Sequence, residues 1–243
     1  MGHMAYTELA QAVALIGTTD TIAVPLGPGV PGGFLHALGT RTDFVHLEIS
    51  GALMPDLYAV LALPGVFYRS GFFGPAERFL RDSGANIDFV PADFRRFEPI
   101  LQKMKPRVVA TAGSPPVDGW ISLSLHAGAT VDEIHRAGAD PERLLIVEVS
   151  ESFPRTFGVS PHHEHRVHVD EVDVLLMTDR TPLDLADTVP TEAEIQIANL
   201  ALTFIHSGST LQTGIGGIPN QIALSLANSD MSDFGIHSEM FTT

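Results

Sequence analysis

Short apolar runs recur along the first 180 residues, and glycine-rich, proline-rich or polar segments separate them. Apolar runs of about four to eight residues bounded by turn signals are typical of strands that are buried on both faces of a sheet. The pattern therefore predicts strands over residues 21–25, 44–49, 66–69, 87–90, 108–111, 144–149 and 172–177.

Amphipathic segments lie between most of these runs. Apolar residues at helical spacing predict a helix over 6–16, with Thr7 as its cap. Similar segments predict a helix that begins at Phe34 and helices over 76–82 and 130–137. This alternation indicates an α/β fold with an open, mainly parallel sheet flanked by helices.

A proline-containing linker over 181–190 precedes a second, shorter α/β segment. Thr191 and Glu194 have the spacing of a capping box, which predicts a helix from there through His206. We place a boundary near residue 188, which divides the chain into an N-terminal domain, 4–188, and the truncated start of a second, similar domain, 189–243. About fifty residues bury too little surface to fold alone, so we expect a fragment or a fold completed by another chain.

Composition excludes several classes of function. The formal net charge is −15, from 14 basic and 29 acidic residues, which disfavours binding to nucleic acid. The absence of cysteine excludes disulfides, thiolate metal sites and cysteine nucleophiles. No apolar run is long enough for a membrane span and no signal peptide is visible, so we expect a cytoplasmic protein without a membrane partner.

Glycines cluster between a predicted strand and a predicted helix near the end of the sequence. Gly214, Gly216 and Gly217 would let backbone N–H groups approach a phosphate or thioester oxygen at the start of the helix. A dinucleotide fingerprint requires a further glycine where Pro219 or Asn220 stands, so a nucleotide-binding domain is disfavoured. A tight turn that only packs is the alternative for this loop.

A single carboxylate, Glu239, follows the last predicted strand. Open α/β sheets bind ligands at the carboxyl ends of their strands, so Glu239 is a candidate nucleophile for acyl transfer. His237 lies two residues earlier, on the same face of the strand, where it would tune the carboxylate or fill space. The alternative for Glu239 is a solvated surface residue.

These two C-terminal segments, 211–220 and 235–241, resemble the acetyl-CoA hydrolase / 4-hydroxybutyrate CoA-transferase family of class I CoA-transferases. Three upstream segments resemble motifs of the same family in the same order, namely 114–123 (SPPVDGWISL), 154–158 (PRTFG) and 167–173 (VHVDEVD). The resemblance covers nearly the whole chain and implies two similar α/β domains with an active site between them.

The resemblance also implies roles for particular residues. Glu239 matches the nucleophilic glutamate of the family. The CoA-binding loop of the family matches Gly214, Ile215, Gly216, Gly217 and Asn220. Further candidates for substrate contact are Gly29, whose loop faces the cleft in the family, together with Ser114 and His237. Gly29 and Ser114 have tight turns as their alternative interpretation.

The implied reaction moves CoA between an acyl-CoA, such as acetyl-CoA, and a small carboxylic acid through a glutamyl-CoA thioester. CoA is then a substrate, and no permanently bound cofactor is expected. Acyl-CoA hydrolysis is one alternative, and an inactive half-enzyme that needs a complementary chain is another. A non-enzymatic assembly module is a third. We expect a homo-oligomer or a complementary C-terminal domain as partner, whereas the acyl donor and acceptor stay open.

A histidine-rich stretch and an arginine each have a structural and a functional interpretation. Residues 162–165 (HHEH) are an apparent insertion, and we expect a solvated loop without a metal because adjacent loop residues rarely converge on one ion. Arg155 would pair with an acidic residue as a structural ion pair or bind a carboxylate of the substrate, and we favour the first interpretation.

Overall fold

The computed structural model describes residues 5–126, 128–182 and 189–238. The chain divides into two compact units, Met1–Leu183 and Asp184–Thr243. The assignment of 4–188 and 189–243 as the two domains of a family member stays a prediction.

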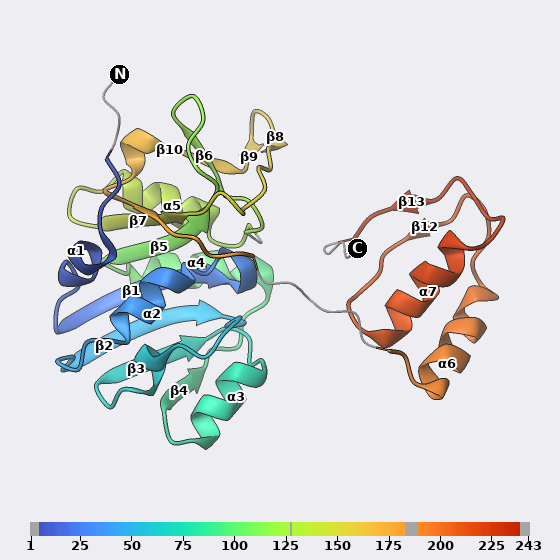
Figure 1. Ribbon diagram of the computed structural model, residues 1–243, viewed down its shortest axis with the longest axis horizontal. Coiled ribbons are helices and arrows are strands. Elements are labelled where there is room, and N and C mark those ends of the chain that lie inside the picture. The colour runs from blue at the N-terminus through green and yellow to red at the C-terminus, as the bar shows by residue number, and fades with distance from the viewer. Residues whose placement is uncertain (1–4, 127, 183–188, 239–243) are drawn as a thin grey trace. The chain divides into compact units, whose positions relative to one another are not determined.

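A seven-stranded parallel sheet forms the centre of the first unit, with strand order β11-β7-β5-β1-β2-β3-β4 (Figure 1). The predicted α/β fold with a mainly parallel sheet is confirmed, and each of the seven strands lies where an apolar run predicts it. The strands are β1 (Thr19–Leu26), β2 (His46–Ala52), β3 (Val66–Ser70), β4 (Asn86–Phe89), β5 (Val108–Gly113), β7 (Leu144–Val149) and β11 (Val174–Met177).

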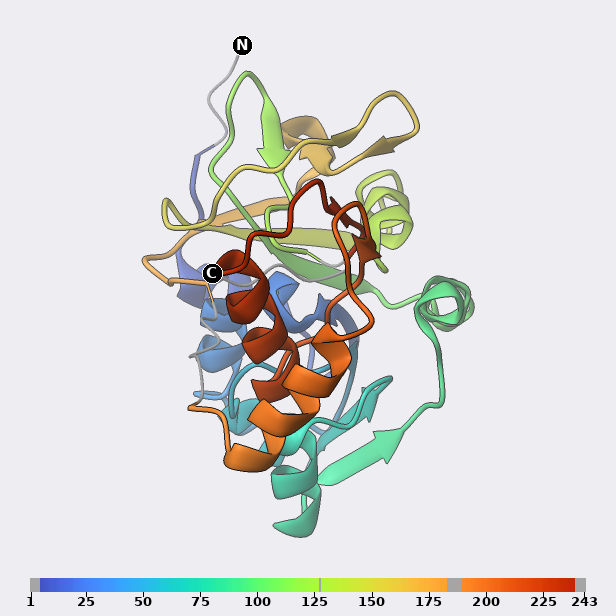
Figure 2. The same cartoon turned by 90° about the vertical axis from the view of Figure 1, so that its right-hand side faces the viewer.

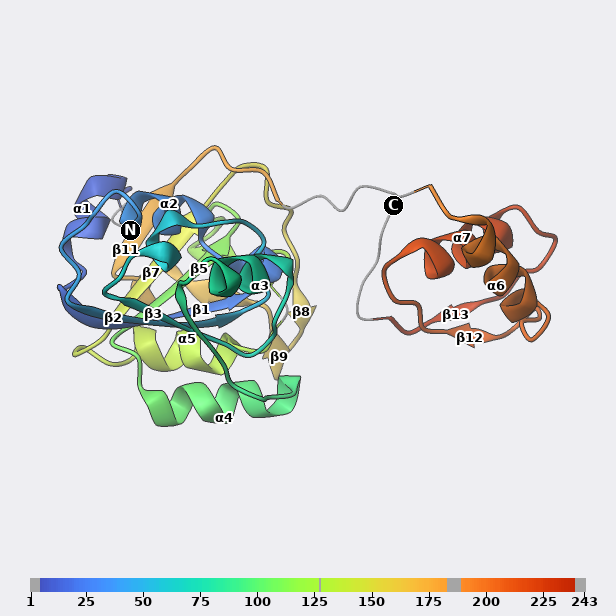
Figure 3. The same cartoon turned by 90° about the horizontal axis from the view of Figure 1, so that it is seen from below.

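Helices cover both faces of this sheet, which explains why its strands are continuously apolar (Figure 3). One face packs against α1 (Leu9–Ala14), α2 (Gly32–Leu38) and α3 (Pro75–Asp82). The other face packs against α4 (Phe94–Met104) and α5 (Val131–Gly138). Short 3-10 helices follow β1 (η1, Gly27–Gly29), precede β3 (η2, Ala59–Ala62) and precede β11 (η3, Val169–Glu171).

The first helix is shorter than its pattern predicts. Thr7 is extended, and its backbone N–H donates to the carbonyl of Leu175 on β11 at 2.8 Å. The predicted Thr7 cap is therefore wrong, since pairing with the edge strand delays the helix to Leu9. Helix α4 was not predicted. Asp93 caps it by accepting the N–H of Arg96 at 3.0 Å, and Pro99 lies inside it.

Two small antiparallel ladders stand outside the main sheet. Strand β6 (Trp120–Ser122) pairs with β10 (Arg166–His168), and β8 (Gly158–Val159) pairs with β9 (His163–Glu164). The second ladder contains part of the histidine-rich stretch that was expected to be a solvated loop. His165 follows this ladder and is half-buried, and its Nδ1 lies within hydrogen-bond distance of Thr156 Oγ1, at 2.8 Å.

The second unit is one strand–helix–strand repeat preceded by a helix. It contains α6 (Glu192–Leu202), β12 (Thr210–Leu211), α7 (Gly217–Ala227) and β13 (Gly235–Ile236), and its two strands pair in parallel. Figures 1 and 2 show α6 and α7 side by side. The predicted capping box is confirmed, since Thr191 Oγ1 accepts the N–H of Glu194 and the Glu194 carboxylate accepts the N–H of Thr191. The helix ends at Leu202 rather than His206, with Thr203 as its cap.

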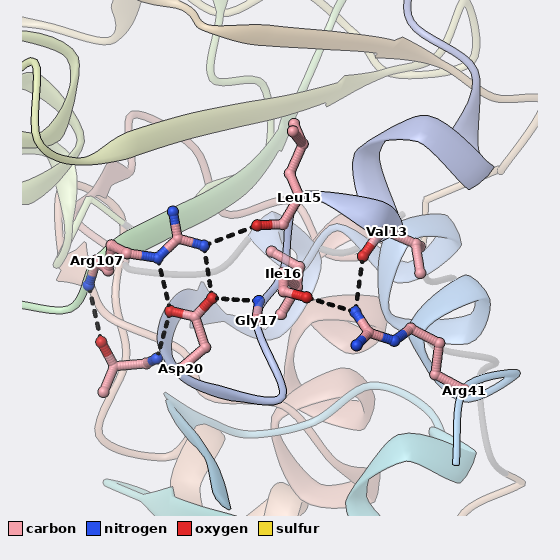
Figure 4. Close-up of polar contacts among 8 residues, drawn as sticks. Val13, Leu15, Ile16, Gly17, Asp20, Arg41 and Arg107 are labelled. Carbon is pink, nitrogen blue, oxygen red and sulfur yellow. Dashed lines mark hydrogen bonds and ion pairs between the residues drawn. The ribbon is translucent and has the colours of Figure 1, made fainter. Parts of the chain in front are cut away.

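An ion pair between a buried carboxylate and a partly exposed guanidinium joins the amino ends of β1 and β5 (Figure 4). Asp20 is buried and binds the guanidinium of Arg107 with both oxygens, at 2.8 and 2.5 Å. The same carboxylate accepts the backbone N–H groups of Gly17 and Thr21, each at 2.8 Å. Burial opposes ionisation of Asp20, but these hydrogen bonds and the charge of Arg107 outweigh it and lower its pKa below the ordinary value.

We predict that Asp20→Asn lowers the free energy of unfolding at pH 7 by about 1–3 kcal/mol, because the buried amide loses the charge-assisted hydrogen bonds to Arg107, which is partly exposed. The lowered pKa means that this contribution is present at neutral pH and is lost as the pH falls through the folded-state value, below 3.8. Urea unfolding of the variant measures the effect. Asp43→Asn is the control, since Asp43 pairs with Arg41 at the surface and should change stability little. Equal effects of the two substitutions would contradict the assigned role of Asp20.

Candidate functional site

The strand order of the first unit reverses between β1 and β5. These two strands pair only at Ile22 with Val108 and at Ala23 with Val109. Beyond this ladder β1 continues to pair with β2, and β5 with β7. Open α/β sheets bind ligands outside the carboxyl ends of the strands at such a switch point. The predicted residues Gly29 and Ser114 both lie there, directly after β1 and β5.

The loop with Gly29 has no room for a side chain. A Cβ at Gly29 would lie 2.9 Å from Cδ2 of His126 and 3.0 Å from Cβ of Pro25. The first contact is closer than real Cβ atoms show and the second is tighter than most, so the backbone of this loop lies directly against the imidazole ring. Gly29 is thus required for packing, whether or not the loop also contacts substrate.

Ser114 has a buried hydroxyl without a hydrogen-bond partner in the part of the chain that the structure describes. Its backbone N–H donates to the carbonyl of Ser122 at 2.9 Å, which fixes the turn after β5. Buried hydroxyls are normally paired, and unpaired ones call for a functional or solvent explanation. The assignment of Ser114 to substrate contact stays a prediction.

His126, beneath Gly29, was not predicted as part of the site. Gly128 donates its N–H to Nδ1 at 2.8 Å, so Nε2 carries the proton and donates to Thr130 Oγ1 at 2.5 Å. Burial disfavours the imidazolium, and the His165 ring, 5.8 Å away, adds to this, so the pKa of His126 falls to about 3. Burial also lowers the pKa of His165. No motif surrounds His126 in the sequence, and only its contacts identify it.

The three upstream segments that resemble family motifs meet beside this switch point. Thr156 of the PRTFG segment donates its N–H to Ser122 Oγ at 2.8 Å, and Val167 pairs with Ile121. Arg155 donates to the carbonyl of Pro115 at 3.0 Å. Within the described ranges Arg155 makes no ion pair, so the favoured interpretation of it is not supported. Arg155 instead holds the loop that follows Ser114.

The glycine loop of the second unit connects β12 to α7. Gly216 has φ +126°, a conformation that side chains other than glycine rarely adopt. Open space surrounds the Cβ positions of Gly214 and Gly216, and Ile215 is exposed. A Cβ at Gly217 would collide with the Glu194 carboxylate, so this glycine lets α7 begin close to α6.

A helix follows this loop, as the sequence predicts, and it begins at Gly217. Asn220 lies in the first turn of α7 and donates its backbone N–H to the carbonyl of Gly216 at 3.1 Å. The loop thus presents an exposed turn at the amino end of an eleven-residue helix, where N–H groups and the helix dipole favour an anion.

The segment that leads to Glu239 lies alongside the start of the glycine loop. His237 is exposed and donates its N–H to the carbonyl of Leu211 at 2.9 Å. Ser238 Oγ donates to the carbonyl of Thr213 at 2.7 Å. Glu239 itself lies outside the described residues. The two parallel strands β12 and β13 therefore end together at the glycine loop, and the assignment of CoA binding and catalysis to these residues stays a prediction.

Comparison with known proteins gives two long matches among curated relatives. The chain is 28% identical over 237 residues to the succinyl-CoA:cyclohexane-1-carboxylate CoA transferase of Geobacter metallireducens, covering 96% of the chain and 51% of that protein. It is 31% identical over 227 residues to the 4-hydroxybutyrate coenzyme A transferase of Clostridium kluyveri, covering 86% and 50%. The chain spans about half the length of the curated relatives it matches. No protein-family model matches it.

Solved structures share the fold at lower identity. RipA from Yersinia pestis superposes with a TM-score of 0.82 at 23% identity, covering 96% of this chain and 55% of RipA. The 4-hydroxybutyrate CoA-transferase of Porphyromonas gingivalis superposes with a TM-score of 0.64 at 21% identity, covering 97% and 54%. Among the helices that the structure describes, none has the length and apolar character needed to cross a membrane.

We predict that the stability of this chain falls below pH 6.5 because of His126. Its folded pKa is lowered to about 3, so below pH 6.5 the unfolded chain takes up a proton that the folded chain excludes. Between pH 7 and pH 5 this costs about 2 kcal/mol of unfolding free energy. His126→Gln, which keeps a donor towards Thr130, should remove that part of the pH dependence in urea unfolding. His162→Gln, at an exposed position, should leave it intact; an unchanged slope in His126→Gln would contradict the assignment.

Proposed function

Because this chain is homologous to the N-terminal half of CoA-transferases, we propose that the protein containing it transfers CoA between an acyl-CoA and a small carboxylic acid. The observation that carries the proposal is homology to these enzymes along 96% of the chain. The second unit supports the proposal. Ser238, the residue before Glu239, donates to the carbonyl of Thr213, which lies next to the open glycine loop between β12 and α7. CoA serves as a substrate rather than as a resident cofactor.

Glu239 is the proposed nucleophile. Its carboxylate attacks the thioester carbonyl, which expels CoA thiolate and leaves an acyl-glutamyl anhydride. The thiolate then attacks the glutamyl carbonyl and releases the donor acid, giving a glutamyl-CoA thioester. The acceptor carboxylate attacks this thioester, expels CoA thiolate and forms a second acyl-glutamyl anhydride. The thiolate then attacks the acyl carbonyl of this anhydride, which gives the new acyl-CoA and releases the Glu239 carboxylate. Each tetrahedral intermediate carries an oxyanion, which needs N–H donors.

The residues around Glu239 take supporting roles in this proposal. The turn formed by Gly214, Ile215, Gly216 and Gly217, with Asn220 in the first turn of α7, binds CoA. Its exposed backbone and the positive end of the helix dipole suit a phosphate or a thioester oxygen. His237 directly follows β13, two residues before the proposed nucleophile, and in this proposal it contacts substrate.

The first unit contributes substrate contacts in this proposal. The hydroxyl of Ser114, which has no partner within the described residues, donates to the carboxylate of the acid at the switch point. Gly29 keeps its loop close to His126, so that the loop backbone approaches the substrate without an intervening side chain.

The chemistry admits hydrolysis as a second outcome, because water can replace the acceptor acid. We propose transfer as the main activity, in a cytoplasmic enzyme that uses acyl-CoA and a small carboxylate. The proposed partner is either a complementary C-terminal domain, within the same polypeptide or a partner chain, or a second copy in a homo-oligomer. Assembly without catalysis is the competing proposal, and a monodisperse monomer in size-exclusion chromatography argues against an obligate partner.

We predict that Glu239→Gln abolishes exchange between acetyl-CoA and a labelled carboxylate in the full-length protein. The amide keeps the size of the side chain but removes the nucleophilic oxygen anion. Isotope incorporation into acyl-CoA measures the exchange. Glu192→Gln, an exposed glutamate at the start of α6, is the matched control and should retain activity. Undiminished exchange by Glu239→Gln refutes the nucleophile assignment.

We also predict that residues 1–243 alone show no CoA release from acetyl-CoA. In the proposal the second half supplies the remainder of the oxyanion and CoA-binding groups, whose loss typically lowers rates by ~10²–10³ per donor. A thiol-release assay on the purified chain, with and without an added C-terminal half, measures this. Turnover by the isolated chain would overturn the view that a complementary domain is needed.

A further inference from the structure

Leu53 has an unusual backbone for a bulky apolar residue. It follows β2 at the carboxyl edge of the sheet and has φ +48°, in the left-handed region. The other non-glycine residues with positive φ in the described ranges are polar, namely Lys105, Asp118, Ser124 and Asp233. Left-handed conformations in residues other than glycine, asparagine and aspartate carry a strain that surrounding structure must hold, and they cluster at functional sites.

Hydrogen bonds hold this conformation from three sides. The carbonyl of Leu53 accepts the N–H of Gly27 in the η1 loop at 3.1 Å. Its N–H donates to the carbonyl of Phe72, after β3, at 3.4 Å. The next peptide is fixed by the N–H of Met54, which donates to the fully buried carboxylate of Glu77 at 2.8 Å. Leu53 therefore connects the ends of β1, β2 and β3.

The side chain of Leu53 is directed out of the core, with 39% of its surface exposed. Its Cδ2 lies 3.6 Å from the Cβ position of Gly27, and its Cδ1 lies 3.4 Å from that of Gly74. Both flanking residues are glycines, so no other side chain shares this space at those positions. The leucine thus presents an apolar surface beside the loop of the switch point.

Folding does not account for a leucine at this position. Glycine would adopt φ +48° without strain, and asparagine would adopt it more readily than leucine. The side chain is also only partly buried, with 39% of its surface exposed. The fold therefore maintains a strained backbone that holds an exposed apolar group at the edge where open α/β sheets bind ligands.

We propose that Leu53 is a specificity-determining residue that contacts the hydrocarbon part of the acyl group. The inference rests on the proposed CoA-transferase function and adds a substrate class to it, acyl groups with an apolar chain. Contact with apolar surface favours such chains over acetyl, because each methylene that leaves water adds to binding. A methylene group in an apolar site changes kcat/KM by roughly tenfold or more.

The test uses the full-length protein with acetyl-CoA and hexanoyl-CoA as donors. Leu53→Asn keeps approximately the same size and suits the left-handed backbone, but replaces methyl groups by an amide. We expect the hexanoyl-to-acetyl ratio of kcat/KM to fall about tenfold, with thermal stability unchanged or higher. Leu53→Met restores an apolar contact and should keep the ratio close to that of the wild type.

Val45→Asn is the matched control, since Val45 is 72% exposed and precedes the same strand at the opposite edge of the sheet. It should leave the ratio unchanged. Active Leu53→Asn with an unaltered ratio, or equal losses on both donors, would overturn the role of Leu53 while leaving the proposed function intact. A wild-type protein that acts on neither donor would instead refute the proposed function, and the role of Leu53 with it.

Discussion

The short ladder between β1 and β5 is the constraint on which the site of the first unit depends. At the amino ends Asp20 and Arg107 join the two strands through paired charge-assisted hydrogen bonds. The ladder then ends after two residue pairs, and the carboxyl ends bind to β2 and β7 instead. Two strands that are joined at one end and separately paired at the other leave their following loops free to face a ligand. Gly29 and Ser114 occupy those loops.

Long-range contacts then determine the form of the switch point. His126 supports the Gly29 loop, and His165 and Thr156 lie behind it. Arg155 binds the turn after Ser114 from a segment forty residues away. The segments with family resemblance in the first unit are thus neighbours in space. Their shared position gives a physical reason for residues that are far apart in the sequence to depend on one another.

The sequence predicts the strands well because both faces of the sheet are covered, which makes each strand an unbroken apolar run. It also predicts the Thr191 capping box, a signal contained within four residues. It fails where the cause is a distant contact. Thr7 is drawn into pairing with Leu175, and His126 becomes a neutral buried ring only through Gly29, Gly128 and Thr130. The φ of Leu53 likewise depends on two neighbouring strands. In the candidate site, the sequence predicts the glycine loop and the positions of Gly29 and Ser114 after their strands, whereas His126 and Leu53 are identified only by their contacts and backbone conformation.

The buried carboxylates of the first unit support a nucleophile located elsewhere. Among the described residues, Asp20, Glu77, Glu133 and Glu148 are buried acidic residues whose carboxylates accept hydrogen bonds. The oxygens of the partly exposed residue Glu98 are buried as well, and they form an ion pair with Arg136. Glu148 lies on β7, near the carboxyl end of that strand. Its carboxylate accepts hydrogen bonds from the N–H groups of Gly33 and Phe34 and from the hydroxyl of Thr178. A carboxylate whose lone pairs are committed to such donors is a poor nucleophile. These hydrogen-bonded carboxylates are therefore unsuited to nucleophilic attack, which is consistent with our proposal that the nucleophile is Glu239, in the other unit.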